Sequence, residues 1–161
     1  MSSPIKKVLL AIALLVAAAS AQAAGRVEVR WVKPELFSDI GHIRWQRDST
    51  LQALGDFMQQ LGQRLPDGQT LQIEVTDVDL AGELDRSSWH ETRVLRGGAD
   101  LPRISLRYTL QADGRSVKTG EASLADLNYL GPPLLPPSRQ VELAYEKQML
   151  ERWFRETFAA P

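Results

Sequence analysis

The densest group of carboxylates in this sequence lies between residues 74 and 85 and could bind a divalent cation. Carboxylate oxygens are hard ligands of the kind that Ca²⁺ takes, and Asp77 and Asp79 are separated by a single residue. The sequence therefore allows a metal site centred on Asp77 and Asp79, with Glu83 and the more distant Asp126 as further candidate ligands. A metal-dependent enzyme or a divalent-cation-binding protein would be built around such a site.

The same stretch also has a structural interpretation. Residues 77–82 read Asp-Val-Asp-Leu-Ala-Gly, which suits the end of a strand and a turn, because Asp side chains accept hydrogen bonds from nearby backbone amides. The spacing does not match an EF-hand loop, which needs a third ligand two residues after Asp79 and a closing Glu. We therefore expect Asp77 and Asp79 to hold the end of a strand in shape without a metal.

No other residues in the chain form a catalytic pattern. The chain has no Cys, which excludes a thiolate zinc site, and its histidines are His42 and His90. Ser87 and Ser88 lie close to His90, but no strand–turn–helix nucleophile motif surrounds them. The Arg-Gly-Gly of residues 96–98 lacks the following helix that a phosphate-binding loop requires. We therefore expect no catalytic residues and no cofactor.

The element that must position the acidic group is a strand. From Leu71 to Val75 every second residue is aliphatic, which is the pattern of a half-buried strand. The next aliphatic residues, Val78 and Leu80, are out of phase, so an unbroken strand would direct Asp77 and Asp79 into the core at a high desolvation cost. A bulge or bend near Thr76-Asp77 would flip the register and restore the buried face, and we predict one there.

The first 23 residues have the composition of an export signal. Two lysines precede an apolar run over residues 8–19, and Ala-Gln-Ala at residues 21–23 fits the cleavage rule. The apolar run is too short to span a bilayer, which needs about 20 residues. We expect residues 1–23 to be removed and residues 24–161 to form a single periplasmic domain with no membrane segment after cleavage.

The composition limits which covalent links and which classes of partner this domain can have. Without Cys, the domain has neither a disulfide nor a lipid anchor at the cleavage site. The chain carries 19 Lys and Arg against 20 Asp and Glu, a net charge of −1, with its arginines spread along the sequence. This balance argues against nucleic-acid binding. The partner expected from the sequence is a periplasmic protein.

Periodicity predicts the remaining elements. Apolar residues recur at three- and four-residue steps from Leu51 to Leu65, which predicts an amphipathic helix with its N-cap at residues 48–50. A second helix is predicted from about Arg139 to Phe158, anchored by Trp153 and Phe154. Alternation and turn residues predict strands at 27–32, 93–96, 104–110 and 117–124, a tight turn at Asp113-Gly114, and a loop at 84–88.

This order of elements indicates the α+β class. We expect a mixed, mostly antiparallel sheet of about four or five strands with two helices packed on one face. If the first strand neighbours the strand that begins near Leu71, the intervening helix makes a parallel crossover between them. The proline-rich Gly131–Ser138 should be an extended connector to the last helix, although it could also bind a partner groove.

Four motifs in the chain resemble a known family: Val29–Asp39, Val75–Gly82, Pro102–Leu110 and Tyr145–Phe154. Together they are similar to a family of secreted proteobacterial proteins catalogued as domain of unknown function 3016. The resemblance covers nearly all of residues 24–161 and implies a periplasmic setting in a Gram-negative bacterium. It implies no activity, substrate or catalytic residue.

Two functional hypotheses follow from the sequence. The first is a non-enzymatic periplasmic binding or envelope-accessory module whose protein partner uses an exposed sheet edge or the proline-rich segment. The alternative is a metal-dependent enzyme or divalent-cation-binding protein centred on Asp77 and Asp79. The convergence of these carboxylates in the folded chain distinguishes the two.

Overall fold

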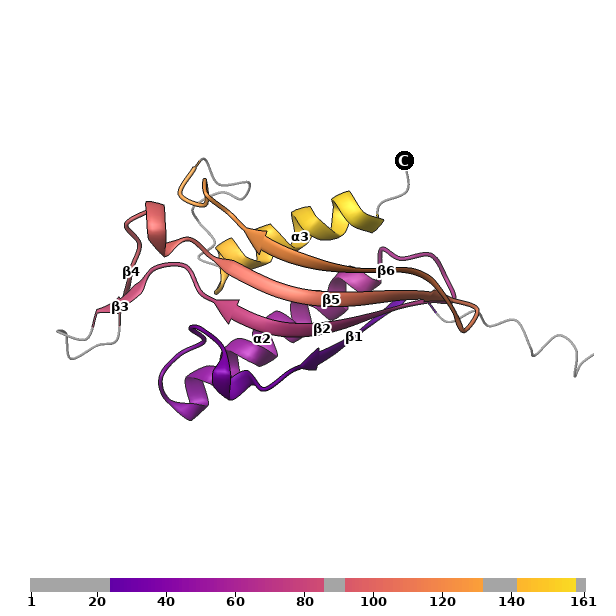
Figure 1. Ribbon diagram of the computed structural model, residues 1–161, viewed down its shortest axis with the longest axis horizontal. Helices are drawn as coiled ribbons and strands as arrows, with labels where there is room; N and C mark the ends of the chain where they lie inside the picture. Colours follow the sequence, from indigo (N-terminus) through magenta and orange to yellow (C-terminus); the bar gives the residue numbers. More distant parts are fainter. Residues whose placement is uncertain (1–23, 86–91, 132–141, 159–161) are drawn as a thin grey trace, which may run out of the picture.

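The computed structural model describes residues 24–85, 92–131 and 142–158 (Figure 1). The expectations for the export signal at residues 1–23, for Ser87, Ser88 and His90, and for the proline-rich residues 132–138 lie outside the described residues. Within the described ranges, no helix is both long enough and apolar enough to cross a membrane.

A four-stranded mixed sheet forms the centre of the domain, with strand order β1-β2-β5-β6. β1 (Arg26–Trp31) pairs in parallel with β2 (Gln69–Asp79), and β2, β5 (Arg103–Ala112) and β6 (Arg115–Ala125) pair antiparallel. A parallel pair needs a crossover connection. The helix α2 (Arg44–Gly62) supplies it, as the sequence predicted.

Both helices, α2 and α3 (Ala144–Phe158), lie on the same side of the sheet (Figure 1). The apolar positions of the strands point to this side, and the core between the layers includes Leu71, Ile73 and Val75 from β2. Trp153 and Phe154 anchor α3 in this core, each less than 8% exposed. The expected fold class is confirmed.

The hairpin between β5 and β6 turns where the sequence predicted. Asp113 and Gly114 have φ angles of 51° and 72°, the left-handed conformations of a two-residue hairpin turn. Farther along β6, a Cβ added at Gly120 would lie 2.6 Å from the hydroxyl oxygen of Tyr108. The absence of a side chain at Gly120 therefore makes room for the Tyr108 ring.

The predicted start of α2 is wrong. α2 begins at Arg44 after an N-cap at Ile43 that makes no side-chain capping bond, so residues 48–50 lie inside the helix. Thr50 is buried inside α2 rather than at its N-terminus. α3 begins at Ala144, directly after Leu143, whose left-handed φ of 57° is incompatible with a right-handed helix; the predicted start near Arg139 lies outside the described residues.

The predicted loop at residues 84–88 is wrong at Leu84 and Asp85, which belong to a small second sheet, and residues 86–88 lie outside the described residues. β3 (Glu83–Asp85) pairs antiparallel with β4 (Thr92–Val94), whose position the sequence predicted to within one or two residues. β3 has three residues, too few to show an alternating pattern in the sequence, and its pairing with β4 stabilises it. Two short 3₁₀ helices complete the described elements: η1 (Pro34–Leu36) after β1 and η2 (Gly98–Asp100) before β5.

Candidate functional site

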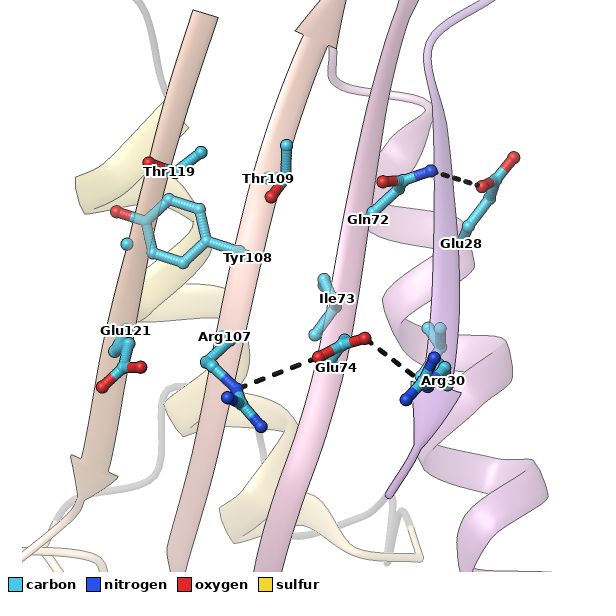
Figure 2. A pocket seen from close by; sticks show the side chains of 12 residues that line it. Glu28, Arg30, Gln72, Ile73, Glu74, Arg107, Tyr108, Thr109, Thr119 and Glu121 are labelled. Atoms are coloured by element: carbon cyan, nitrogen blue, oxygen red, sulfur yellow. Dashed lines mark hydrogen bonds and ion pairs between the residues drawn. The ribbon is translucent and has the colours of Figure 1, made fainter. Parts of the chain in front are cut away.

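The side of the sheet that faces away from the helices, which we call the open face, forms a shallow trough (Figure 2). All four strands of the main sheet contribute to it, and its volume is about 800 Å³. Because side chains alternate along a strand, each strand that buries one set of residues must present the other set here. The charged and amide side chains of the trough are Glu28, Arg30, Gln72, Glu74, Arg107 and Glu121.

A row of alternating charges crosses the trough from one edge of the sheet to the other (Figure 2). Arg30 of β1 pairs in register with Glu74 of β2, Glu74 with Arg107 of β5, and Arg107 with Glu121 of β6. Cross-strand pairs of opposite charge stabilise a sheet, each by about 0.2–1 kcal/mol. We call these four residues the charge row.

The ion pairs in the charge row are loose. Arg30 Nε lies 3.5 Å from Glu74 Oε1, and Arg107 Nε lies 3.8 Å from Glu74 Oε2. The side chains of Arg30 and Arg107 are 71% and 52% exposed. Because a guanidinium carries five N–H donors, both arginines keep donors that a partner could use. The neighbouring row is also polar, with Gln72 donating to Glu28 over 3.3 Å.

The predicted bulge at the end of β2 is confirmed. Val75 pairs with Leu106 and Asp77 pairs with Ser105, so Thr76 is the extra residue, and its hydroxyl donates to the Ser105 carbonyl over 3.1 Å. The bulge shifts the phase so that Val78 is fully buried. Asp77 and Asp79 consequently lie on the opposite side of the strand from the core.

Asp77 fastens the loop after β1 to the end of β2. Its carboxylate oxygens accept hydrogen bonds from the backbone N–H and the hydroxyl of Ser38, each over 2.8 Å. Hydrogen bonds to a charged acceptor are stronger than neutral ones. Asp77 therefore performs the structural role expected of it, although it binds the neighbouring loop rather than amides of its own strand.

The other candidate ligands are held by three different arginines. Asp79 Oδ2 lies 3.3 Å from Arg103 Nη1, and Glu83 Oε2 lies 3.2 Å from Arg96 Nη1. Burial raises the pKa of Asp79, the Arg103 guanidinium opposes that shift, and the charges of Asp39 and Asp77 add to it. The buried Asp126, at the end of β6, accepts a 2.6 Å hydrogen bond from Arg152 of α3.

The candidate ligands thus contact partners on separate elements. Across the described ranges, no group of three or more His, Asp or Glu side chains is placed to hold a metal ion. The geometry of these carboxylates is that of structural ion pairs between strands, loops and α3.

Sequence reasoning missed a network around residues 80–82. Arg93 of β4 donates from Nη1 to the carbonyls of Leu80, Ala81 and Gly82 over 3.4, 3.1 and 2.7 Å, and from Nη2 to Asp39 Oδ2 over 2.6 Å. From the other side, Glu146 of α3 accepts a 2.8 Å hydrogen bond from the Ala81 amide.

Glu146 is buried in this network, with 2% of its surface exposed, and burial raises its pKa. The sequence did carry a signal for it. Glu146 lies three and four residues before Met149 and Leu150, on the apolar side of the predicted helix, where a charged residue needs a partner.

Comparisons with known proteins locate the chain in one family. No curated protein and no solved structure matches it significantly. The family model described as "Protein of unknown function (DUF3016)" matches residues 25–156, which is most of the chain and includes every strand of the described structure. The resemblance noted in the sequence is thereby confirmed, and the protein belongs to the DUF3016 family.

Proposed function

We propose that this protein is a non-enzymatic binding or envelope-accessory module of the periplasm, and that its open face receives a protein partner. The observation that carries the proposal is the contrast between the carboxylates near the end of β2 and the charge row on the open face. The carboxylates near the end of β2 form hydrogen bonds and ion pairs of 2.6–3.3 Å that join neighbouring strands and loops. The charge row has contacts of 3.5 and 3.8 Å and lies in an open trough.

The trough suits a protein surface in its size and its chemistry. Its volume of about 800 Å³ falls within the range of ligand sites, but mixed charges from four strands line it rather than an apolar pocket. Exposed arginines are favoured at protein interfaces, because their donors form a planar fork that matches carboxylates. A partner with complementary charges would replace the water that now solvates Arg30 and Arg107.

The periplasmic setting rests on the composition of residues 1–23, which is that of a cleavable export signal. The chain has no Cys that a lipid anchor or a disulfide could use. The proposed module therefore works in solution after cleavage, held together by its core.

Partner capture from a periplasmic extract tests the proposal. The mature protein is crosslinked to its neighbours, and the same capture is repeated with Arg30→Gln combined with Arg107→Gln. Arg155→Gln, which changes an exposed arginine on α3, is the matched control. We expect the double variant to lose the captured protein and the control to keep it. Equal capture by all three proteins, or no reproducible capture by the wild type, would contradict the proposal.

A further inference from the structure

β6 leaves one edge of the main sheet without a strand partner among the described residues. The sheet order places β6 outermost, with β5 on its inner side, and the strand is 11 residues long. An edge of this length presents a row of backbone N–H and C=O groups that can pair with another extended segment. Such strand addition is a common way for a sheet to bind a peptide.

The usable part of this edge is Lys118–Ala125. A register shift against β5 leaves Val117 as an extra residue, and a bulge interrupts regular pairing there. Beyond the bulge the strand pairs regularly with β5 up to Ala125. Several of its side chains are small, including Gly120, Ala122 and Ser123, so they leave the outer backbone accessible.

The charge row shows what an added strand must carry. The row has one end on each edge strand, Arg30 on β1 and Glu121 on β6, and Arg30 already forms an ion pair with Glu74. Glu121 is exposed, and no described residue forms an ion pair with it. The next strand would therefore continue the alternation if it placed a cation opposite Glu121.

We propose that an extended segment of a partner protein adds to β6 along Lys118–Ala125 as a further strand, with a Lys or Arg opposite Glu121. This inference rests on the proposed function, because it describes how the partner meets the open face. Backbone hydrogen bonds along the edge bind the partner segment to β6. The cation opposite Glu121 fixes the register of that segment and selects partners that carry a Lys or Arg there.

A second copy of this chain does not meet the same requirement. In a symmetric antiparallel pairing of two β6 strands, the helices of both copies lie on the same side of the joined sheet. The cation of this stretch, Lys118, points to the helix side, where its Nζ donates to the Thr157 carbonyl over 2.7 Å and lies 5.5 Å from the Phe158 ring centre. It therefore cannot stand opposite Glu121, which points to the open face.

Two synthetic peptides test this inference on the mature protein. Both are short strands of alternating Thr and Val, identical except for a central Lys in one and a central Glu in the other. Binding is followed through the NMR signals of the backbone amides. We expect shifts centred on β6 and a preference of about two- to thirty-fold for the Lys peptide, from the change of repulsion into attraction across the strand pair.

Charge reversal of the protein supplies the control. Glu121→Lys should reverse the preference between the peptides, whereas Asp56→Lys, which changes an exposed carboxylate on α2 and away from the open face, should leave it intact. The inference is overturned if neither peptide binds at millimolar concentration, if Glu121→Lys leaves the preference unchanged, or if the amide shifts centre on β1. It is also overturned if the protein dimerises through β6 instead.

The strand-addition inference can fail while the proposed function stands. If Arg30→Gln with Arg107→Gln abolishes capture of the periplasmic partner while Glu121→Lys has no effect on it, the open face binds its partner without strand addition. That result would keep the proposed function and reject this inference.

Discussion

Glu146 has the smallest exposed fraction of any carboxylate in the described structure, and we predict that it makes the stability of the protein depend on pH. Burial raises its pKa in the folded state above the ordinary glutamate value of about 4.3. A group with a raised folded pKa contributes stability below its unfolded pKa and loses that contribution as the pH rises through the folded value. The wild type should therefore lose stability as the pH rises from about 4.3 through the folded pKa of Glu146.

Replacement of Glu146 by Gln tests this dependence. The amide oxygen can still accept the hydrogen bond from the Ala81 N–H, and it cannot ionise. We expect the unfolding midpoint of Glu146→Gln to fall less than that of the wild type as the pH is raised from 4 towards neutrality. Parallel pH profiles for the two proteins would contradict a buried, titrating Glu146.

Asp77 distinguishes a structural carboxylate from a metal ligand. Asp77→Ala removes the charged acceptor of two hydrogen bonds from Ser38 and should cost about 1.5–3 kcal/mol, whereas Asp77→Asn keeps one acceptor oxygen and should cost less. Thermal unfolding of the wild type should be the same in millimolar Ca²⁺ and in chelator. A large drop of the wild-type midpoint in chelator, absent from both variants, would instead favour the metal hypothesis.

At the scale of elements, α3 depends on the aromatic side chains that it buries against the sheet. The Trp153 ring lies 5.7 Å from the Tyr108 ring and 5.4 Å from the Phe158 ring, measured between ring centres. Trp153→Ala should therefore lower the free energy of unfolding by about 3–5 kcal/mol. Trp45, which is 66% exposed, provides the matched control, and Trp45→Ala should change urea unfolding little. Equal effects of the two substitutions would mean that α3 is not anchored as described.

The elements differ in how far the sequence could predict them. The irregularity near Thr76-Asp77 was predictable, because a change in the phase of aliphatic residues along one strand requires a bulge or a bend, and the structure has a bulge. The N-terminus of α2 was not, because Ile43 gives no capping signal while Asp48, Ser49 and Thr50 do.

The candidate sites differ in the same way. The pairing of Asp79 with Arg103 and of Asp126 with Arg152 joins residues far apart in sequence, so spacing could not reveal it. The charge row was hidden for the same reason, since its four members come from four strands and meet only through the register of the sheet. Alternation along each strand could predict only that these side chains are exposed.

At the scale of the whole molecule, both helices lie on one side of the main sheet (Figure 1), and the charge row lies on the other (Figure 2). The proposed export of this domain predicts that residues 1–23 are absent from the mature protein. Mass spectrometry of protein isolated from the periplasm should give a mass that begins at Ala24. Isolated protein that still begins at Met1 would reject cleavage and weaken the proposed location.

The central claim is that the open face, rather than the helix layer or the end of β2, is the surface that meets the partner. Chemical labelling of carboxylates in the free protein and in the captured complex measures this directly. We predict that Glu28, Glu74 and Glu121 on the open face lose reactivity in the complex, while Asp56 and Glu156, which are exposed on α2 and α3, keep theirs. Protection of Asp56 and Glu156, with unchanged labelling on the open face, would contradict it.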